Sequence, residues 1–315
     1  MKIGLITNPL SRANRQSGGV AARIAGDPRV SIAHPRNHDQ LVSDLQRFAR
    51  DGVDLIAIDG GDGTIRDVLS NIDSAYTRQW PSIALLPSGK TNVIAGQVGH
   101  FGPGYKGWQN LMAARKAGTL GAKAFPLRAL EISRPNGDTS VQRGFLLGFA
   151  AFTDGVRMAN EKIHPMGIAK GLAVAMVIGG ILRRAVANSL KSGGYPGEAA
   201  TVLVDDTPSN GSRHFLIVAC TLDRLTLGLR PFWDQGTGPI NWLDVAAPPK
   251  STFWGVLNLA FGKRKTWMEK GGYAGGRAET LEVQCDAPFV LDGEVYPSHG
   301  HVRITTTQPI VFLSA

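Results

Sequence analysis

Cysteine is scarce in this sequence, since the 315 residues include two, Cys220 and Cys285. Two cysteines provide neither a metal cluster nor a disulfide framework, so we expect both to be small buried residues on strands. A basic and then apolar leader is also missing before the first expected strand, which favours the cytoplasm over export. Hydrophobic residues make up 43% of the chain and charged residues 19%, which is typical of a globular protein with one large or two modest domains.

The apolar segment at residues 171–182 is too short to span a membrane as a helix, which takes about 20 residues. Basic residues bound this segment closely on both sides. It is either a buried helix, a wall of an apolar substrate pocket or a point of attachment to an anionic membrane surface. Residues 253–261, followed by Lys263-Arg264-Lys265, form a second amphiphilic segment that leaves the same question open.

Acidic residues are outnumbered, with 25 Asp and Glu against 34 Lys and Arg, which leaves a formal charge of +9. Such a charge favours anionic partners, namely a nucleotide, a nucleic acid or an anionic membrane. The basic residues are spread along the chain, and the interleaving of aromatic and basic residues that single-strand binders use is missing. We therefore expect no nucleic-acid partner.

A glycine-rich loop, Gly60-Gly61-Asp62-Gly63-Thr64, lies between an expected buried strand at 53–58 and a helix that begins near Thr64. Its glycines let the backbone approach a ligand closely, and the free N–H groups at the helix start favour an anion. The Asp62 carboxylate suggests a bound divalent metal, an orienting role on the loop or a hydrogen bond to a hydroxyl. The alternative is an ordinary tight turn between strand and helix.

Two more polar loops follow expected strands. Pro87-Ser88-Gly89-Lys90-Thr91-Asn92 follows a strand at 82–86, and Asn8-Pro9-Leu10-Ser11 follows a strand at 2–7. The latter continues into a basic, glycine-bearing loop that either wraps nucleotide phosphates or is a mobile surface loop. Because the carboxyl ends of neighbouring parallel strands define a crevice, we expect these loops to form one site.

The order of elements predicts an α/β N-terminal domain with a parallel sheet at residues 1–122 and a β-rich domain at 123–315. Strands and helices alternate in the first part, which favours right-handed crossovers. Short strand signals dominate afterwards and predict a mainly antiparallel, β-sandwich-like domain. These strands are expected at 127–132, 141–149, 199–204, 215–220, 281–285, 289–291, 302–306 and 310–313.

The three loops, together with Leu291-Asp292-Gly293-Glu294, resemble the signatures of the diacylglycerol kinase catalytic domain family. This family includes bacterial lipid kinases and sphingosine kinases, and its motifs NPxS, GGDGT, LPxGTxN and DGE occur here in order. NAD kinases share the GGDGT loop. Lys90 and Val93 depart from the family, which usually has Thr and Asp at these positions. The resemblance also implies that the final strand can return to the first domain.

The resemblance implies an ATP-dependent lipid kinase that phosphorylates a hydroxyl of a diacylglycerol-like lipid, with Mg²⁺ arriving on the nucleotide. It implies that Glu294 is the base and that Asp62 orients phosphate or metal. The Asp-Gly of the family's metal loop is missing from residues 236–244, so we expect no separate protein-held metal. The implied nucleotide-binding residues are Asn8, Gly60, Gly61, Asp62, Gly63, Thr64, Gly89, Lys90 and Asn92.

The expected partners are a lipid substrate and, transiently, the anionic inner face of a membrane, while a homodimer is left open. Two other functions remain. One is a kinase of a soluble substrate, as the NAD kinases are. The other is a nucleotide- or lipid-binding regulator without turnover, for which the departures at Lys90 and Val93 argue.

Overall fold

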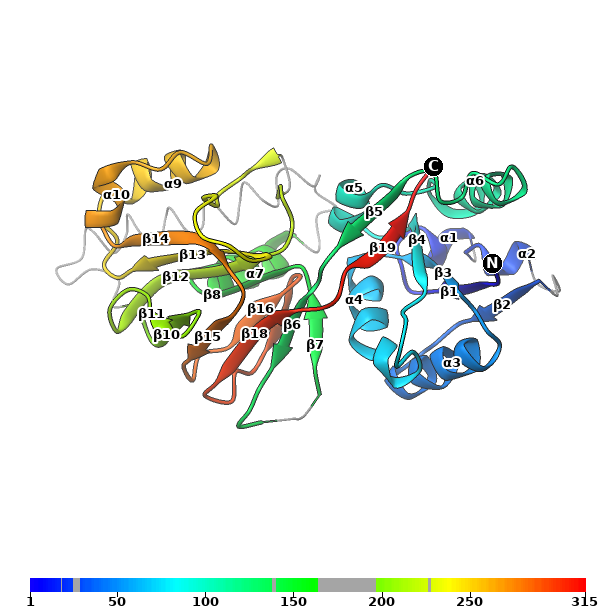
Figure 1. The fold of residues 1–315 in the computed structure, drawn as a ribbon, viewed down its shortest axis with the longest axis horizontal. Helices are drawn as coiled ribbons and strands as arrows, with labels where there is room; N and C mark the ends of the chain where they lie inside the picture. The colour runs from blue at the N-terminus through cyan, green and yellow to red at the C-terminus, as the bar shows by residue number, and fades with distance from the viewer. Residues whose placement is uncertain (18, 25–28, 138–139, 164–196, 226–227) are drawn as a thin grey trace. The chain divides into compact units, whose positions relative to one another are not determined.

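The computed structural model describes residues 1–17, 19–24, 29–137, 140–163, 197–225 and 228–315 (Figure 1). The chain divides into two compact units. Unit 1 comprises residues 1–129 and 308–315, and unit 2 comprises residues 130–307. The apolar segment at 171–182 lies outside the described residues.

Unit 1 is built on a six-stranded sheet in the order β2-β1-β3-β4-β19-β5. Neighbouring strands are parallel, except that β5 is antiparallel to β19. The predicted α/β domain with a parallel sheet is therefore confirmed. The strands are β1 (Ile3–Thr7), β2 (Val30–Ala33), β3 (Leu55–Gly60), β4 (Ser82–Pro87), β5 (Ala124–Leu127) and β19 (Ile310–Leu313).

Helices on both faces of this sheet explain why its central strands are mostly apolar and buried (Figure 1). Every residue of β1 and β3 is buried. On one face α3 packs through Leu45 and Phe48, and on the other α6 packs through Trp108 and Leu111. The helical elements are α1 (Asn14–Ser17), α2 (Ala21–Ile24), α3 (His38–Arg50), α4 (Asp62–Asn71), η1 (Ile72–Ser74), α5 (Val93–Val98) and α6 (Gly104–Lys116).

The boundary expected near residue 122 lies after Ala129 in the structure. β5 belongs to unit 1 because it pairs with β19, which itself pairs with β4. The continuous strand expected at 127–132 is therefore two strands in different sheets, β5 and β6. The final strand, β19, lies within the sheet of unit 1.

Unit 2 consists of two antiparallel sheets that enclose an apolar core, as predicted for a sandwich-like domain. One sheet has the order β11-β10-β15-β18-β6-β7, and the other has β14-β13-β12-β8-β16-β17 with β9 beside β12. The strands are β6 (Leu130–Ser133), β7 (Gln142–Gly144), β8 (Leu146–Ala150), β9 (Glu198–Ala199), β10 (Thr201–Val204), β11 (Thr207–Pro208), β12 (Arg213–Cys220), β13 (Ile240–Ala246), β14 (Tyr273–Ala278), β15 (Leu281–Gln284), β16 (Phe289–Leu291), β17 (Glu294–Tyr296) and β18 (Val302–Thr306).

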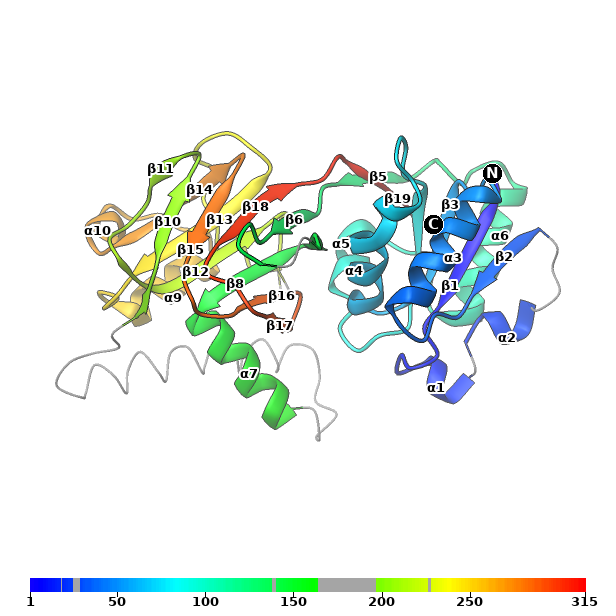
Figure 2. The same ribbon diagram turned by 90° about the horizontal axis from the view of Figure 1, so that it is seen from below.

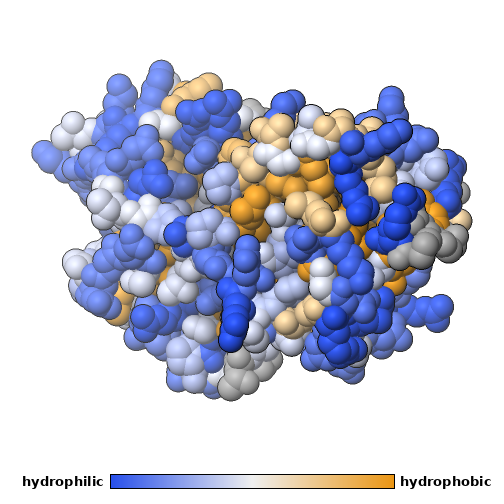
Figure 3. Space-filling view, turned by 45° about the vertical axis from the view of Figure 1, so that its right-hand side comes forward, coloured by the Kyte–Doolittle hydropathy of each residue, from blue (hydrophilic) through white to orange (hydrophobic). Residues whose placement is uncertain are grey.

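Among the described residues of unit 2, the helices α7 (Ala151–Ile163) and α10 (Thr266–Lys270) were not expected from the sequence, whereas α9 (Thr252–Ala260) covers most of the amphiphilic segment at 253–261. α7 continues from the end of β8 (Figure 2), while α9 and α10 precede β14. Among the described residues, none of the helices has the length and apolar character needed to cross a membrane. On the face drawn in Figure 3, hydrophilic residues predominate around smaller hydrophobic areas. Cys220 and Cys285 are both buried, as expected, but only Cys220 lies on a strand, since Cys285 directly follows β15.

Candidate functional site

Three loops leave the sheet of unit 1 side by side, at the carboxyl ends of β1, β3 and β4. Backbone hydrogen bonds join each loop to the next, because the pairing of the strands continues into them. The amide of Asn8 donates to the carbonyl of Asp59 at 3.0 Å, and the amide of Ser88 donates to that of Gly60 at 3.0 Å. The loops that the sequence predicted at one crevice therefore lie together.

The glycines of the two main loops allow these loops to touch. A Cβ on Gly89 would stand 2.6 Å from the Cα of Gly61, and one on Gly60 would stand 2.6 Å from the side chain of Thr64. Both distances are shorter than a carbon contact allows. Around Gly63 there is more room, since the nearest atom to an added Cβ lies at 3.8 Å. Close packing between the loops thus accounts for Gly61 and Gly89, and close packing within the first loop accounts for Gly60.

Asp62 joins the first glycine loop to the helix that follows the second. Its carboxylate accepts the hydroxyl of Thr91 at 2.8 Å and the backbone amides of Val93 at 3.0 Å and Ile94 at 3.2 Å. A carboxylate at the start of α5 satisfies amides that the helix leaves unpaired and complements its dipole. Asp62 thereby holds the second loop against the first, and its expected role toward phosphate or metal stays a prediction.

The start of α4 has the features of an anion-binding element. α4 begins at Asp62, two residues before the expected start, and its N-cap is Gly61, which has no side chain to bond the first amides. The amides that begin α5 already bond to Asp62. Because unpaired N–H groups and the positive end of the dipole meet at a helix start, a phosphate fits best at residues 61–64.

Two asparagines expected to bind nucleotide also shape the loops. The Asn8 side chain donates to the hydroxyl of Thr64 at 2.9 Å and accepts the amide of Leu10 at 2.9 Å. Asn92 has a left-handed backbone, with φ of 49°, and its side chain both accepts from and donates to the backbone of Gly89. These bonds hold the loop on which the exposed Lys90 stands.

A buried polar cluster beneath these loops was missed from the sequence. Asp59 is fully buried, and one of its carboxylate oxygens accepts the amide of Val20 at 3.0 Å. The Asn14 side chain, 3% exposed, donates to the carbonyls of Asn8 and Asp59. Ser88 bonds the hydroxyl of Ser11 at 2.8 Å. The cluster joins the basic loop after β1 to the other two loops. In the sequence, its one indication was Asp59, a polar residue near the end of the apolar strand β3.

Burial raises the pKa of the Asp59 carboxyl above its usual 3.8, although hydrogen bonds from Val20, Asn14 and Ser88 oppose the shift. The carboxyl therefore holds its proton to a higher pH than an exposed aspartate does.

Glu294, the predicted base, is an exposed residue on β17 of unit 2, whereas the other predicted site residues belong to unit 1. It follows Asp292-Gly293, which forms the two-residue turn between β16 and β17 with φ of 48° and 91°. The Asp292 carboxylate accepts the amides of Phe145 at 3.0 Å and Leu146 at 2.9 Å. Asp292 thereby fixes the turn that leads into Glu294 against the start of β8.

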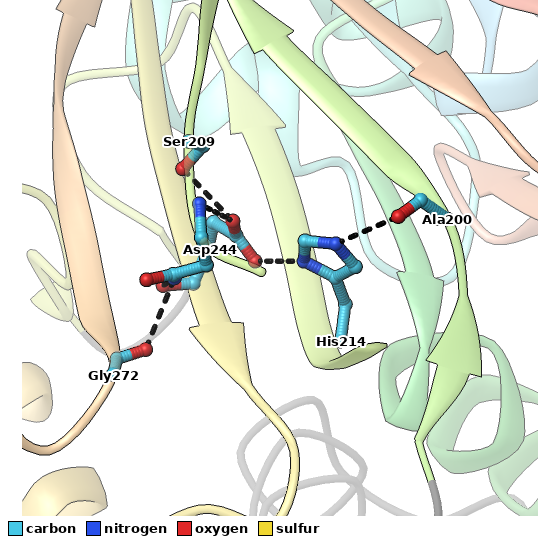
Figure 4. A network of polar contacts seen from close by, with 6 residues as sticks. Ala200, Ser209, His214, Asp244 and Gly272 are labelled. Carbon is cyan, nitrogen blue, oxygen red and sulfur yellow. Dashed lines mark hydrogen bonds and ion pairs between the residues drawn. The ribbon is translucent and has the colours of Figure 1, made fainter. Parts of the chain in front are cut away.

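Asp244, in the stretch where the family's metal loop was sought, is instead part of a buried network (Figure 4). Its carboxylate lies 2.7 Å from Nδ1 of His214, and both side chains are fully buried. It also accepts the hydroxyl of Ser209 at 2.9 Å. Nε2 of His214 lies 3.1 Å from the carbonyl of Ala200, so both ring nitrogens face acceptors.

Burial alone would lower the pKa of His214, but the hydrogen bond and the charge of Asp244 outweigh it and the pKa is raised. A protonated imidazole can donate from both nitrogens at once. The network therefore joins Ala200, between β9 and β10, to His214 on β12 and Asp244 on β13.

A protein-held metal site is not evident in the part of the chain that the structure describes. No group of three or more His, Cys, Asp and Glu side chains there could hold an ion. Magnesium commonly binds through substrate phosphates and waters with one or two carboxylates, so a nucleotide-borne ion is compatible with this donor set.

Comparison with known proteins confirms the resemblance drawn from the motifs. Residues 2–120 match the family model described as the diacylglycerol kinase catalytic domain. No curated protein matched the chain.

Solved structures share the two-domain fold across the whole chain. A candidate diacylglycerol kinase from Bacillus anthracis strain Sterne has a TM-score of 0.65 and 17% identity, over 100% of this chain and 97% of that chain. A diacylglycerol kinase from the same organism has a TM-score of 0.58 and 15% identity, with the same coverage. Yeast NADH kinase in complex with NADH has a TM-score of 0.53 and 11% identity, over 100% of this chain and 84% of that chain.

Proposed function

We propose that this protein is an ATP- and Mg²⁺-dependent kinase that transfers the γ-phosphate to a hydroxyl of a diacylglycerol-like lipid. The observation that carries the proposal is the meeting of three loops at one edge of unit 1, within the residues that match the kinase family model. Phosphoryl transfer asks little covalent chemistry of a protein and depends on positioning and charge stabilisation. The rigidly bonded loops supply such positioning.

In this proposal the amides at the start of α4 bind phosphate oxygens, and Lys90 adds a positive charge. Asp62 keeps the second loop in place through α5. Mg²⁺ supplies neutralisation of phosphate charge. The oxygen of the lipid hydroxyl forms a bond to the γ-phosphorus, the bond from that phosphorus to the β-phosphate oxygen breaks, and Glu294 accepts the hydroxyl proton.

Transfer of labelled phosphate from ATP to a panel of lipids tests the proposal. We expect Glu294→Gln to abolish transfer while nucleotide still binds, because the amide cannot accept the proton. Glu279→Gln is the matched control, since Glu279 is also exposed in unit 2. Full turnover in the Glu294 variant would remove this residue from the role of base. Absence of transfer to every lipid would refute the lipid-kinase activity.

A soluble acceptor is the second candidate, favoured by the fold shared with yeast NADH kinase. Partition of the labelled product decides between the two. Label in the organic phase supports a lipid acceptor, and label in the aqueous phase supports a soluble one. Nucleotide binding without transfer to any acceptor supports the regulator, for which the departures at Lys90 and Val93 argue.

A further inference from the structure

The outer face of α9 exposes large apolar side chains. Trp254 is 59% exposed and Leu257 is 41% exposed, while Phe261, directly after the helix, is 68% exposed. The spacing of three and then four residues places them on one side of a helix. A surface helix normally turns polar residues to solvent, so this face is the reverse of the usual pattern.

The opposite side of α9 is fixed to unit 2. Leu259 is 6% exposed and packs in a cluster with Trp233, Met268 and Tyr273. Gly255 lies so close to the hydroxyl of Tyr273 that a Cβ would collide with it. The helix therefore cannot turn its apolar face inward without losing this packing, and the exposed face is a fixed feature of the fold.

Exposed basic residues flank this apolar face on both sides. Lys250 precedes α9, and Lys263 and Lys265 follow it. The ammonium of Lys263 lies 5.9 Å from the centre of the Phe261 ring. Arg264 instead pairs with Glu269, which is the acidic side chain of α10. The charge that this region presents outward is therefore positive.

We propose that the α9 face, defined as Trp254, Leu257 and Phe261 with Lys250, Lys263 and Lys265, docks on the surface of an anionic lipid bilayer. This proposal rests on the proposed lipid-kinase function and names the surface that reaches the substrate's membrane. A helix of nine residues spans about 13 Å, which is too short to cross a bilayer but sufficient to lie in its interface. Aromatic rings enter the headgroup region, and the lysines meet the lipid phosphates.

Sedimentation of the full chain with vesicles tests the apolar part of the face. We expect binding to vesicles of phosphatidylcholine with phosphatidylglycerol and weaker binding to phosphatidylcholine alone. The double variant Trp254→Ser/Phe261→Ser should bind about tenfold more weakly, because it lacks the two aromatic side chains that the bilayer would bury. Val311→Ser, which changes an exposed apolar residue of β19, should bind as the unmodified protein does.

Paired charge reversals test the basic part. Lys263→Glu/Lys265→Glu should weaken binding on the order of thirtyfold, since each basic residue near an anionic surface contributes about fivefold. Arg50→Glu/Arg78→Glu changes the net charge equally at exposed positions of unit 1. If net charge alone attracted the protein, the two pairs would weaken binding to the same degree, and the proposed face would be wrong.

The remaining outcomes separate this face from the kinase function. Unchanged vesicle binding in the aromatic variant, with unfolding like that of the unmodified protein, would overturn the face and leave the kinase proposal intact.

Phosphate transfer to diacylglycerol in detergent micelles tests the kinase without a bilayer, so its failure alongside intact vesicle binding would overturn only the kinase. A dimer that Trp254→Ser/Phe261→Ser converts to a monomer, without vesicle binding, would identify a self-association surface instead.

Discussion

The buried polar side chains of the two units have different structural roles. In unit 1 they lie where parallel strands finish, and Asp59 and Asn14 bond loops that connect those strands. In unit 2 the pair of His214 and Asp244 lies on adjacent strands of a sheet, with no loop of the predicted site attached. The first arrangement holds the loops of the candidate site together, and the second joins adjacent strands of a sheet. Substitutions should therefore affect ligand binding in unit 1 and stability in unit 2.

The largest expected effect is the removal of one partner of the unit 2 pair. Asp244→Ala removes the carboxylate that accepts from His214 and leaves the buried imidazole without this partner. The free energy of unfolding should therefore fall by about 3–5 kcal/mol. Denaturant titration measures the loss, and amide hydrogen exchange of β12 and β13 locates it. Asp234→Ala, at an exposed position of the same unit, should change little. Equal losses in the two variants would show that the pair does not stabilise the sheet.

A smaller effect, on both the stability of the fold and the affinity for nucleotide, is expected where the two glycine loops touch. Gly89→Ala forces the loop away from Gly61 and should cost about 1–3 kcal/mol of stability. It should also weaken nucleotide binding, measured by calorimetry, because the loops separate. Gly96→Ala is the matched control, since an added Cβ there meets nothing within 4 Å. Unaltered nucleotide affinity in the Gly89 variant would disconnect the loop contact from the site.

The stability of unit 2 should depend on pH through His214. Its pKa is raised on folding, so the folded state binds the proton more tightly than the unfolded state does. The stabilisation is fully present below the unfolded value near 6.5 and is lost as pH rises through the folded pKa. Hydrogen exchange of β12 amides between pH 6 and 9 measures this loss. Asp244→Asn should flatten the dependence, and an unchanged profile would exclude His214 as its source.

The smallest expected effect is that of Asp59 on unit 1. Because burial raises its pKa, unit 1 should lose stability as pH rises from about 3.8 through the folded pKa. Asp59→Asn removes this slope and keeps an oxygen for the amide of Val20, so the change at neutral pH should be about 1 kcal/mol or less. Hydrogen exchange of β3 across this range is the measurement. A slope that persists in the variant would belong to another group.

The sequence predicted the parts of the site that are local in the chain. The apolar runs of β1, β3 and β4 and the glycine motifs after them are continuous segments, and these motifs also matched a family model. The bonds of Asp62 to α5 depend on two loops meeting, which no single segment records. The same holds for Asn14, whose partners are Asn8 in the loop after β1 and Asp59 in β3.

Strands were missed where their residues look like loops. β14 contains Gly275 and Gly276, and a Cβ on Gly276 would stand 2.5 Å from the carbonyl of Gln235. The close approach of a neighbouring chain segment requires glycine there, although glycine is a poor strand former. The boundary at Ala129 had no signal, because residues 127–132 read as one strand and only the pairing of β5 with β19 separates them.

The position of β19 between β4 and β5 also bears on how the chain matures during synthesis. When residues 1–129 leave the ribosome, β4 and β5 have no strand between them, and each exposes an edge with unpaired amides and carbonyls. That gap closes after residues 310–313 have been made, so unit 2 can fold while unit 1 is still open. A nascent chain thus completes the sheet of unit 1 last, although the loop motifs of that unit are translated first.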